Sequence, residues 1–381
     1  RVAYLDIETG SDNGFPDIET ANEEVTAITF KIGKELYVFG RNEFVNKRED
    51  VYYFRFDSET ALLEKFFQLW DAKSPDVVTG WNIETFDIPY LVNRAKRLFD
   101  EKKNPYRLLS PWRKINVRTL FGMGGQELQA YDIIGIETLD YLSMYRKFIY
   151  INQETYRLDH IAFVELGEHK LDYSEQGSLH LLYKNDYQKL IQYNIKDVEL
   201  VERLEEKLKL IEMVVSLAYL CKVNYTNTFG QVRMWDTLIY NNLLRKNIVI
   251  PPKTHSSKSA NFEGAFVKEP ILGMHDWVVN FDLNSLYPHL IIMYNISPET
   301  LVGMHSMDNS EKYFSGSMVE SMLKRGTDTE FLKEKNLTMA PNGSLYTRKK
   351  QGFLPEMMQN IYSDRVKFKE LMIETKKKLT K

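Results

Sequence analysis

Apolar and polar residues follow one another along the first hundred positions in an order that predicts strands and helices in turn. A strand is expected at the start, where the apolar, strand-favouring run VAYLDIE ends in polar residues. Two further strands are expected in TAITFKIG and ELYVFG, around a turn at Gly33. Apolar residues then recur at helical spacing over 59–72, before a short buried strand in DVVTGW and a helix over about 86–99. This order predicts an α/β fold.

The remaining sequence contains fewer but longer patterns. A protruding hairpin is predicted over 115–137, because GMGGQ separates two runs that favour strands. One long helical pattern covers about 186–221. The segment PPKTHSSKSAN, near 250–262, is the best candidate for a linker. Strands are then predicted in GAFVKEP and WVVNFDLNSLYP, and a Lys- and Met-rich helix over about 355–379.

Composition limits the class of protein. A chain of 381 residues usually forms two or three domains rather than one core. No apolar run approaches 18 residues, so no membrane span is expected. The single cysteine, Cys221, fits a reducing compartment, and Arg1, with no signal-like segment, resembles a cut start. The net charge of −3 provides no general attraction to nucleic acid, and the basic clusters at 348–350 and 376–381 are by themselves typical of solvated surface.

Two carboxylates lie close together on the first predicted strand. Asp6 and Glu8 are two residues apart, so their side chains project from one face and could bind one metal ion. The same string, DIET, recurs at 17–20. Pro16 precedes that copy and no apolar run leads into it, which places it in a loop. Context therefore favours the first copy.

Two more acidic residues and a tyrosine complete a pattern. Asp87 lies at a strand-to-helix junction, where it could instead serve as a helix N-terminal charge. Tyr193 and Asp197 are spaced i, i+4 and share a helix face, as an ordinary surface pair also would. Carboxylates about 4 Å apart repel by roughly 4 kcal/mol at an effective dielectric near 20. Convergence of four on Mg²⁺ or Mn²⁺ would reverse that repulsion, and such two-metal sites cleave or form phosphodiesters.

This order of motifs, D-x-E on a strand, N-x(3)-F-D and then Y-x(3)-D on a helix, resembles a known family. It is similar to the 3′→5′ proofreading exonuclease of family B DNA polymerases, a site of four carboxylates and a tyrosine on an RNase H-like fold. The phrases that most resemble polymerases of T-even-type bacteriophages are GWNIETFDIPY, YNIKDVE, GAFVKEP, FDLNSLYP and NISPET. The resemblance runs along essentially the whole chain.

The resemblance implies roles for these residues. Asp6, Glu8 and Asp197 would hold the ion that activates water, Asp6 and Asp87 the second ion, and Tyr193 would orient the water. The cofactors would be Mg²⁺ or Mn²⁺, two per site.

It also implies contacts with DNA. Asn82 and Phe86 would contact the unpaired 3′ end, and Phe262 and Gly264 belong to a loop that approaches template DNA. The hairpin over 115–137 would help to separate a mispaired primer end.

A second, incomplete site is expected near FDLNSLYP. This string resembles the first polymerase palm motif, in which Asp282 would be one of two metal-binding carboxylates. The backbone amides of Ser285 and Leu286 would face a triphosphate, and Tyr287 would press on the sugar. The alternative is a plain buried strand that ends in a turn at Pro288.

Two cations on the last predicted helix would complete what is present of that site. Arg365 and Lys369, spaced i, i+4, resemble the fingers cations that contact the incoming nucleotide, although they could instead form a solvated helix face. The later palm string D-T-D-S and the fingers string K-x(3)-N-S-x-Y-G are absent. This chain alone is therefore not expected to incorporate nucleotides.

The expected fold class is α/β, with an RNase H-like exonuclease domain on a mixed sheet, a partial palm of sheet and helices, and a fingers helix. The expected domains are the exonuclease at 1–209, a helical connector at 210–253, the partial palm at 254–351 and the start of the fingers at 352–381.

The predicted function is that of a proofreading DNA polymerase, of which this chain is the N-terminal portion, in a full or a split enzyme. A free-standing exonuclease and a non-catalytic nucleic-acid-binding fragment remain alternatives. Expected partners are primer–template DNA, a single-stranded 3′ end, dNTP, the remaining polymerase half and, through a C-terminal tail, a sliding clamp. The resemblance implies a phage-encoded protein in the host cytoplasm.

Overall fold

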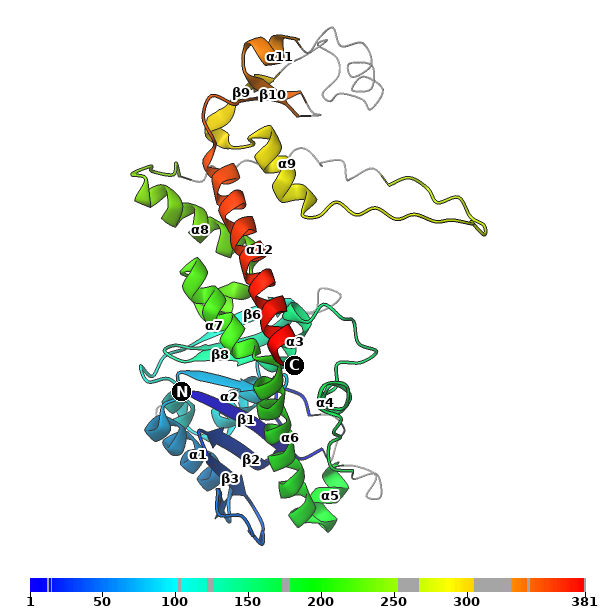
Figure 1. The fold of residues 1–381 in the computed structure, drawn as a ribbon. Helices are drawn as coiled ribbons and strands as arrows, with labels where there is room; N and C mark the ends of the chain where they lie inside the picture. Colours follow the sequence, from blue (N-terminus) through cyan, green and yellow to red (C-terminus); the bar gives the residue numbers. More distant parts are fainter. Residues whose placement is uncertain are drawn as a thin grey trace. The chain divides into compact units, whose positions relative to one another are not determined.

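The chain folds into two compact units, residues 1–257 and 258–381, which are described separately. The computed structural model is shown in Figure 1. It describes residues 1–11, 14, 16–101, 104–121, 127–172, 179–252, 267–304, 330–340 and 343–379.

A six-stranded mixed sheet forms the centre of the first unit, in the order β4-β3-β2-β1-β5-β8. Strand β2 runs antiparallel to both β1 and β3, whereas β1, β5 and β8 are parallel to one another, as are β3 and β4. The strands span Val2–Thr9 (β1), Val25–Ile32 (β2), Glu35–Gly40 (β3), Val51–Arg55 (β4), Val77–Gly80 (β5) and Glu137–Asp140 (β8). The predicted α/β class is confirmed in this mixed form.

Helices cover both faces of this sheet because successive side chains of a strand point to opposite sides. Leu5 and Ile7 of β1 pack into one core with α1 (Glu59–Lys73) and α2 (Asp87–Leu98). Tyr4, on the other face, packs into a core that includes the long helix α6 (Tyr187–Leu208). Figure 1 shows α1 and α6 on opposite sides of strands β1 to β3. The polar residues Asp6 and Glu8 share the α6 face with Tyr4.

The other described helices of this unit lie on or beyond the α6 face. Helices α3, α4 and α7 share a core with α6, α5 packs beside its first turns, and α8 follows α7. They span Tyr141–Phe148 (α3), Leu158–Leu166 (α4), Leu179–Asn185 (α5), Leu210–Cys221 (α7) and Gln231–Arg245 (α8), with a short 3₁₀ turn at Tyr225–Phe229 (η5). A second 3₁₀ turn, Pro105–Leu109 (η2), packs instead with α1 and α2 on the opposite face.

The single helix predicted over 186–221 is wrong, because α6 and α7 are separate. Lys209 between them has a φ of 56°, a left-handed conformation that ends a helix. The carboxylate of Glu205 accepts a hydrogen bond from the backbone N–H of Ile211 at 3.1 Å, which satisfies one of the first N–H groups of α7. Apolar residues continue at helical spacing on both sides of Lys209, so the sequence pattern predicted one helix.

The predicted hairpin is confirmed over its described strands. Strand β6 (Ile115–Phe121) pairs antiparallel with β7 (Glu127–Ile133) as a sheet of two strands. Tyr131 and Ile133 are buried in the core that contains α1 and α2, so the base of the hairpin is attached to the first unit. Residues 122–126 lie outside the described part.

The second unit contains a three-stranded sheet and several helices. The sheet has the order β10-β11-β9, and helix α9 packs against the long helix α12. The elements span Leu286–Tyr294 (α9), Pro298–Thr300 (η6), Leu301–Met304 (β9), Glu330–Glu334 (α11), Leu337–Met339 (β10), Ser344–Thr347 (β11) and Phe353–Leu379 (α12).

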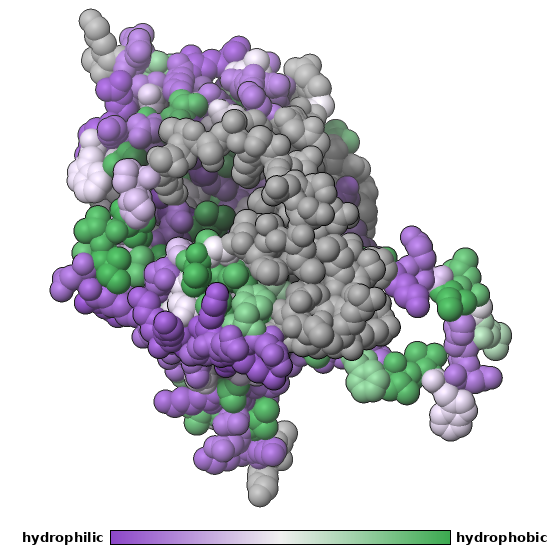
Figure 2. Space-filling view, turned by 90° about the horizontal axis from the view of Figure 1, so that it is seen from above, coloured by the Kyte–Doolittle hydropathy of each residue, from purple (hydrophilic) through white to green (hydrophobic). Residues whose placement is uncertain are grey.

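The strand predicted in WVVNFDL is wrong, because residues 278–283 have no regular secondary structure. Trp277 is 97% exposed and Phe281 88% exposed, and in Figure 2 this segment extends to the right with hydrophobic side chains open to view. An apolar strand forms only where a neighbour takes up its backbone hydrogen bonds. The described residues of GAFVKEP, 267–270, form no strand either.

Across the described ranges, no helix combines the length and the apolar character needed to cross a bilayer.

Candidate functional site

Three of the predicted carboxylates meet between β1 and α6. Ligand oxygens of Asp6, Glu8 and Asp197 all lie within 4.8 Å of one another. Asp6 and Glu8 reach this point from the α6 face of β1, and Asp197 from the buried side of α6, which packs across β1 and β2. The alternation of side chains along β1 and the turn of α6 therefore bring these three carboxylates together.

Asp87 reaches the same strand from the other direction. It is the first residue of α2, and its Oδ1 accepts a hydrogen bond from the backbone N–H of Ile7 at 3.0 Å. That N–H is available because the described pairing of β1 with β5 ends at Tyr4 and Thr79. Gly80 allows the chain to turn there, since a Cβ would lie 2.3 Å from the carbonyl oxygen of Leu5. Asp87 is thus held beside β1 without belonging to the group of three.

The four carboxylates repel one another in a buried environment. Burial raises the pKa of Asp6 well above its usual range, and the charges of Asp197, Asp87 and Glu8 raise it further. Burial raises the pKa of Glu8 to about 8 and that of Asp87 to about 7, with neighbouring carboxylates adding to both. Such clustered, shifted carboxyls are typical of functional sites.

Lys170 also belongs to this site, although the sequence analysis did not identify it. Its Nζ donates hydrogen bonds to Asp197 Oδ2 at 2.5 Å and to the Tyr193 hydroxyl at 2.9 Å. The backbone N–H of Lys170 donates to Asp159 Oδ1 at 2.8 Å, which attaches the loop to the first turn of α4. Burial raises the pKa of Asp197, and the charge of Lys170 opposes that rise. Lys170 lies outside any periodic pattern, so no sequence signal pointed to it.

Asn194 is a second residue that the sequence analysis missed. Its Nδ2 donates to Asp6 Oδ2 at 2.6 Å, and its Oδ1 accepts from the hydroxyl of Thr29 on β2. This buried bridge orients the Asp6 carboxylate between β2 and α6. Its position immediately after Tyr193 was the only available signal.

The cluster fits a divalent cation by an observation independent of the carboxylate count. Asp197 Oδ1 is buried, yet accepts no hydrogen bond from any residue that the structure describes. A buried acceptor without a donor is costly, and a cation would satisfy it. Carboxylate oxygens are the ligands that hard divalent ions such as Mg²⁺ and Mn²⁺ prefer.

The two predicted DNA-contacting residues of this site, Asn82 and Phe86, lie in the turn before Asp87. Asn82 has a φ of 68° and accepts a hydrogen bond through Oδ1 from the hydroxyl of Thr85 at 2.6 Å. Phe86 stacks on Tyr90, with ring centroids 5.7 Å apart. Both residues are only partly buried, in the turn between β5 and α2. Phe262 and Gly264 lie outside the described residues.

The predicted second site lies at the junction of α9 and α12. Asp282 is in the exposed extended segment rather than at the end of a strand, and Ser285, with a φ of 53°, precedes α9. Leu286 and Tyr287 form the first turn of α9, with Tyr287 exposed. The following helix, α12, contains Arg365 and Lys369.

One pair of contacts joins the two segments that carry the residues of the predicted second site. Asn284 Nδ2 donates to the hydroxyl of Tyr362 at 3.4 Å, and His289 packs edge-on against the ring of Tyr362. Since Tyr362 is three residues before Arg365, the palm-like motif lies beside the helix with the predicted cations.

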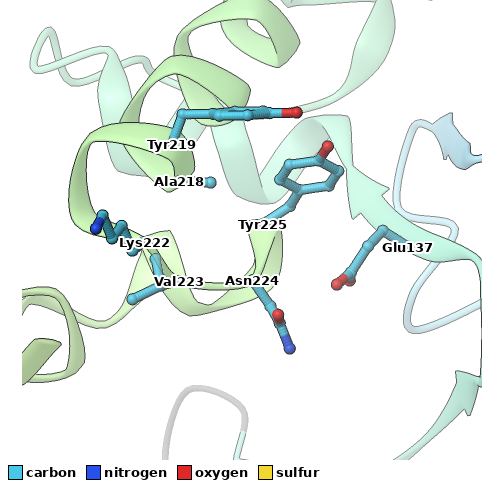
Figure 3. Close-up of a pocket in the computed structure, with 7 residues that line it drawn as sticks. All are labelled: Glu137, Ala218, Tyr219, Lys222, Val223, Asn224 and Tyr225. Atoms are coloured by element: carbon cyan, nitrogen blue, oxygen red, sulfur yellow. The ribbon is translucent and has the colours of Figure 1, made fainter.

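A pocket of about 350 Å³ lies elsewhere in the first unit, at the end of α7. Figure 3 shows Tyr219 and Tyr225 along one wall and the Glu137 carboxylate on another. The other lining residues are Ala218, Lys222, Val223 and Asn224. One carboxylate does not provide the paired ligands that metal-dependent phosphodiester chemistry needs, so we assign the candidate active site to Asp6 and its neighbours.

Comparison with known proteins gives the family. Residues 1–161 match the model of the "DNA polymerase family B, exonuclease domain", and residues 222–381 match that of "DNA polymerase family B". The chain belongs to family B of the DNA polymerases. The first match includes Asp6, Glu8 and Asp87 but ends before Lys170, so the placement of Tyr193 and Asp197 beside them rests on geometry.

Individual family B polymerases are similar over nearly the whole chain. The DNA-directed DNA polymerase of Escherichia phage RB69 is 33% identical over 400 residues, which cover 98% of this chain and 42% of the relative. That of Enterobacteria phage T4 is 31% identical over 399 residues, with the same coverage of both chains. The DNA polymerase delta catalytic subunit of Candida albicans is 27% identical over 389 residues, 97% of this chain and 35% of the relative. The chain thus spans less than half the length of these relatives.

Proposed function

We propose that residues 1–209 form a metal-dependent 3′→5′ exonuclease of the RNase H-like fold, which edits the product of a family B DNA polymerase. The observation that supports this most directly is the convergence of Asp6, Glu8 and Asp197 within 4.8 Å. Asp87, bonded to the backbone of the same strand, adds the fourth carboxylate. Four carboxylates on a family B exonuclease domain favour hydrolysis of phosphodiesters over simple binding.

The residues present can hold two ions of Mg²⁺ or Mn²⁺. Asp6, Glu8 and Asp197 would hold one, and Asp6 and Asp87 the other. When bound, such ions lower the pKa of a water molecule and offset charge on the leaving 3′ oxygen. Asn194 keeps one oxygen of Asp6 in a fixed orientation through a 2.6 Å hydrogen bond, so that ligand is already positioned.

Tyr193 provides a hydrogen-bond donor beside the carboxylates. Burial and the charge of Asp197 raise the pKa of its phenol, so the hydroxyl keeps its proton at neutral pH. Its oxygen already accepts a hydrogen bond from Lys170. The hydroxyl also lies within hydrogen-bonding reach of Asp197, one of the proposed metal ligands. A water or a phosphate oxygen bound beside Asp197 would therefore be oriented by this hydroxyl, the role predicted for Tyr193.

The turn between β5 and α2 is the proposed contact for a single-stranded 3′ end. Phe86, which immediately precedes Asp87, and Asn82 are partly exposed there. A base can stack on an aromatic ring whatever its identity, as a sequence-independent exonuclease requires.

For the remaining chain we retain the predicted domains: a helical connector at 210–253, a partial palm at 254–351 and the start of the fingers at 352–381. Asp282, the start of α9 and the cations Arg365 and Lys369 would contribute to nucleotidyl transfer with dNTP and primer–template DNA. The exposed apolar residues from Trp277 to Leu283 are supporting evidence, because such a run is normally covered. The remaining polymerase half, in the same or another chain, would cover it.

The exonuclease is tested with single-stranded DNA labelled at one end. With Mg²⁺, a 5′-labelled strand should shorten stepwise and a 3′-labelled strand should release labelled mononucleotide at once. A chelator should stop both reactions. No digestion under any divalent metal would favour a non-catalytic nucleic-acid-binding fragment instead.

The polymerase assignment is tested separately by primer extension. The chain alone should incorporate no dNTP, whereas the chain together with the remaining polymerase half should extend a primer. That extension should disappear in Asp282→Asn. Extension by the Asp282→Asn protein would overturn the palm assignment, and digestion without any extension would favour a free-standing exonuclease.

A further inference from the structure

Arg118 connects the β6–β7 hairpin to the turn that precedes Asp87. Its Nη2 donates to a carboxylate oxygen of Glu84, in the turn between β5 and α2. Its Nε donates to Asp132 Oδ1, on the partner strand of the hairpin, at 2.9 Å. The guanidinium of Arg118, on β6, therefore contacts both the partner strand β7 and the turn, and the Arg118 side chain is only 37% exposed.

The turn that contains Glu84 is internally bonded. The backbone N–H of Glu84 donates to Asp140 Oδ2 at 3.1 Å, and the other Asp140 oxygen accepts from Ser143 at the start of α3. The backbone N–H of Phe86 donates to the carbonyl of Asn82 at 3.0 Å. A displacement of Glu84 is therefore transmitted through a short, bonded turn to Asp87.

The other strand of the hairpin contacts the helix that begins with Asp87. The hydroxyl of Tyr131, on β7, donates to Asn93 Oδ1 at 2.5 Å and accepts from Lys96 Nζ at 2.8 Å. Asn93 and Lys96 both belong to α2. The hairpin thus contacts the turn before Asp87 and the helix after it.

From these contacts we propose that Arg118 is a positioning residue for the exonuclease reaction. Its ion pair with Glu84 couples the position of the hairpin to the orientation of Asp87, so that hydrolysis is fastest when the hairpin is seated against the turn. This inference rests on the proposed exonuclease function. It assigns Arg118 no contact with substrate.

The rival explanation is that Arg118 binds a DNA phosphate directly. The positioning role and the phosphate contact predict different kinetics. A positioning residue changes the rate of the bound complex, because misplacing a catalytic group by about 1 Å can cost about 100-fold. A phosphate contact instead changes the apparent affinity for DNA and its salt dependence.

The experiment measures single-turnover digestion of a single-stranded oligonucleotide as a function of enzyme and salt concentration. Arg118→Met, Glu84→Gln and the double variant are compared with the unaltered chain. Arg113→Met is the matched control, because Arg113 also forms an ion pair of similar exposure, with Asp71 on α1, but does not touch the turn. Arg118→Lys tests whether charge alone is sufficient, and thermal unfolding checks that every variant is folded.

We expect Arg118→Met and Glu84→Gln each to lower the maximal rate about 10-fold at unchanged half-saturating concentration, and the double variant to be no slower than the slower single variant. Arg113→Met should retain the full rate.

Multiplicative losses in the double variant, or a single-variant rate within twofold of the unaltered chain, would overturn the coupling. A loss confined to affinity, or tighter DNA binding in Glu84→Gln, would support the phosphate contact instead. Absence of digestion by the unaltered chain would refute the proposed function, which distinguishes that failure from failure of the coupling.

Discussion

The Lys170 ammonium lies 2.5 Å from Asp197 Oδ2, and its Nζ is 4.9 Å from the centre of the Tyr193 ring. One cation therefore contacts both members of the Y-x(3)-D motif. Its charge also lowers the cost of holding Asp6 and Glu8 close to Asp197. The site thus contains its own positive charge among four carboxylates, which has consequences for both rate and stability.

Replacing Lys170 by methionine should slow exonuclease digestion about 100-fold, the usual effect of removing one hydrogen-bond donor from an active site. It should also lower the melting temperature in chelator, because the buried carboxylates lose a compensating charge. Single-turnover digestion and thermal unfolding measure the two effects. Lys207→Met is the control, since Lys207, near the end of α6, pairs with Glu165 at 3.1 Å and lies away from the carboxylates. A Lys170→Met rate within twofold of the unaltered chain would remove Lys170 from the site.

Replacing Asp6 or Asp87 by alanine should slow digestion by at least about 1,000-fold while the chain remains folded, because each removes a proposed metal ligand. The chain contains its own control in the second DIET string. Asp17 is exposed and accepts a hydrogen bond from the backbone N–H of Thr20 at 2.7 Å, so it serves a local turn. Asp17→Ala should digest DNA at the normal rate. Near-normal digestion by Asp6→Ala or Asp87→Ala would refute the site assignment.

Replacing Glu8 by glutamine should stabilise the chain at alkaline pH when a chelator removes divalent ions. The Glu8 carboxyl has its pKa raised from an ordinary value of 4.5 to about 8 in the folded state. Between these values the folded chain keeps a proton that the unfolded chain has lost, so this group's contribution to stability falls as pH rises through that window.

Above pH 8 the Glu8 carboxylate is charged and the full cost of burying that charge remains, so Glu8→Gln should be the more stable protein. The expected difference is at least about 1 kcal/mol, which is below the roughly 1.4 kcal/mol that a pKa shift of one unit represents. At about pH 4 the two proteins should unfold alike. Thermal unfolding with chelator at both pH values measures this difference, and Glu19→Gln, an exposed position, is the control. An equal or lower melting temperature for Glu8→Gln at alkaline pH would contradict the repulsion.

Replacing Arg94 by alanine should destabilise the first unit by about 3–5 kcal/mol, because it leaves a buried carboxylate unpaired. Arg94 donates to both oxygens of Glu59, at 2.8 and 2.7 Å, and the two side chains are only 9% and 10% exposed. Denaturant unfolding measures the loss. Arg97→Ala, three residues further along α2, should cost under about 1 kcal/mol, since its contact is exposed. Equal losses in the two variants would contradict the buried pair.

The local elements of the first unit could be predicted from the sequence because they depend on backbone periodicity. Alternation placed Asp6 and Glu8 on one face of β1, and helical spacing placed Tyr193 and Asp197 on one face of α6. The same reasoning was wrong for Trp277 to Leu283, because an apolar run becomes a strand only beside another strand. It was also wrong at Lys209, where apolar spacing continued through a left-handed residue.

The sequence by itself therefore determined which residue types could hold a metal and which of them share a face of one element. Only the tertiary structure decided that Asp87 reaches the backbone of Ile7, that Lys170 pairs with Asp197 and that Arg118 reaches Glu84. The first of these contacts depends on β5 lying beside β1 in the sheet, although three strands and a helix separate them in the chain. Periodicity acts within one element, whereas contacts between distant segments depend on strand order and on the packing of cores, which no local pattern specifies.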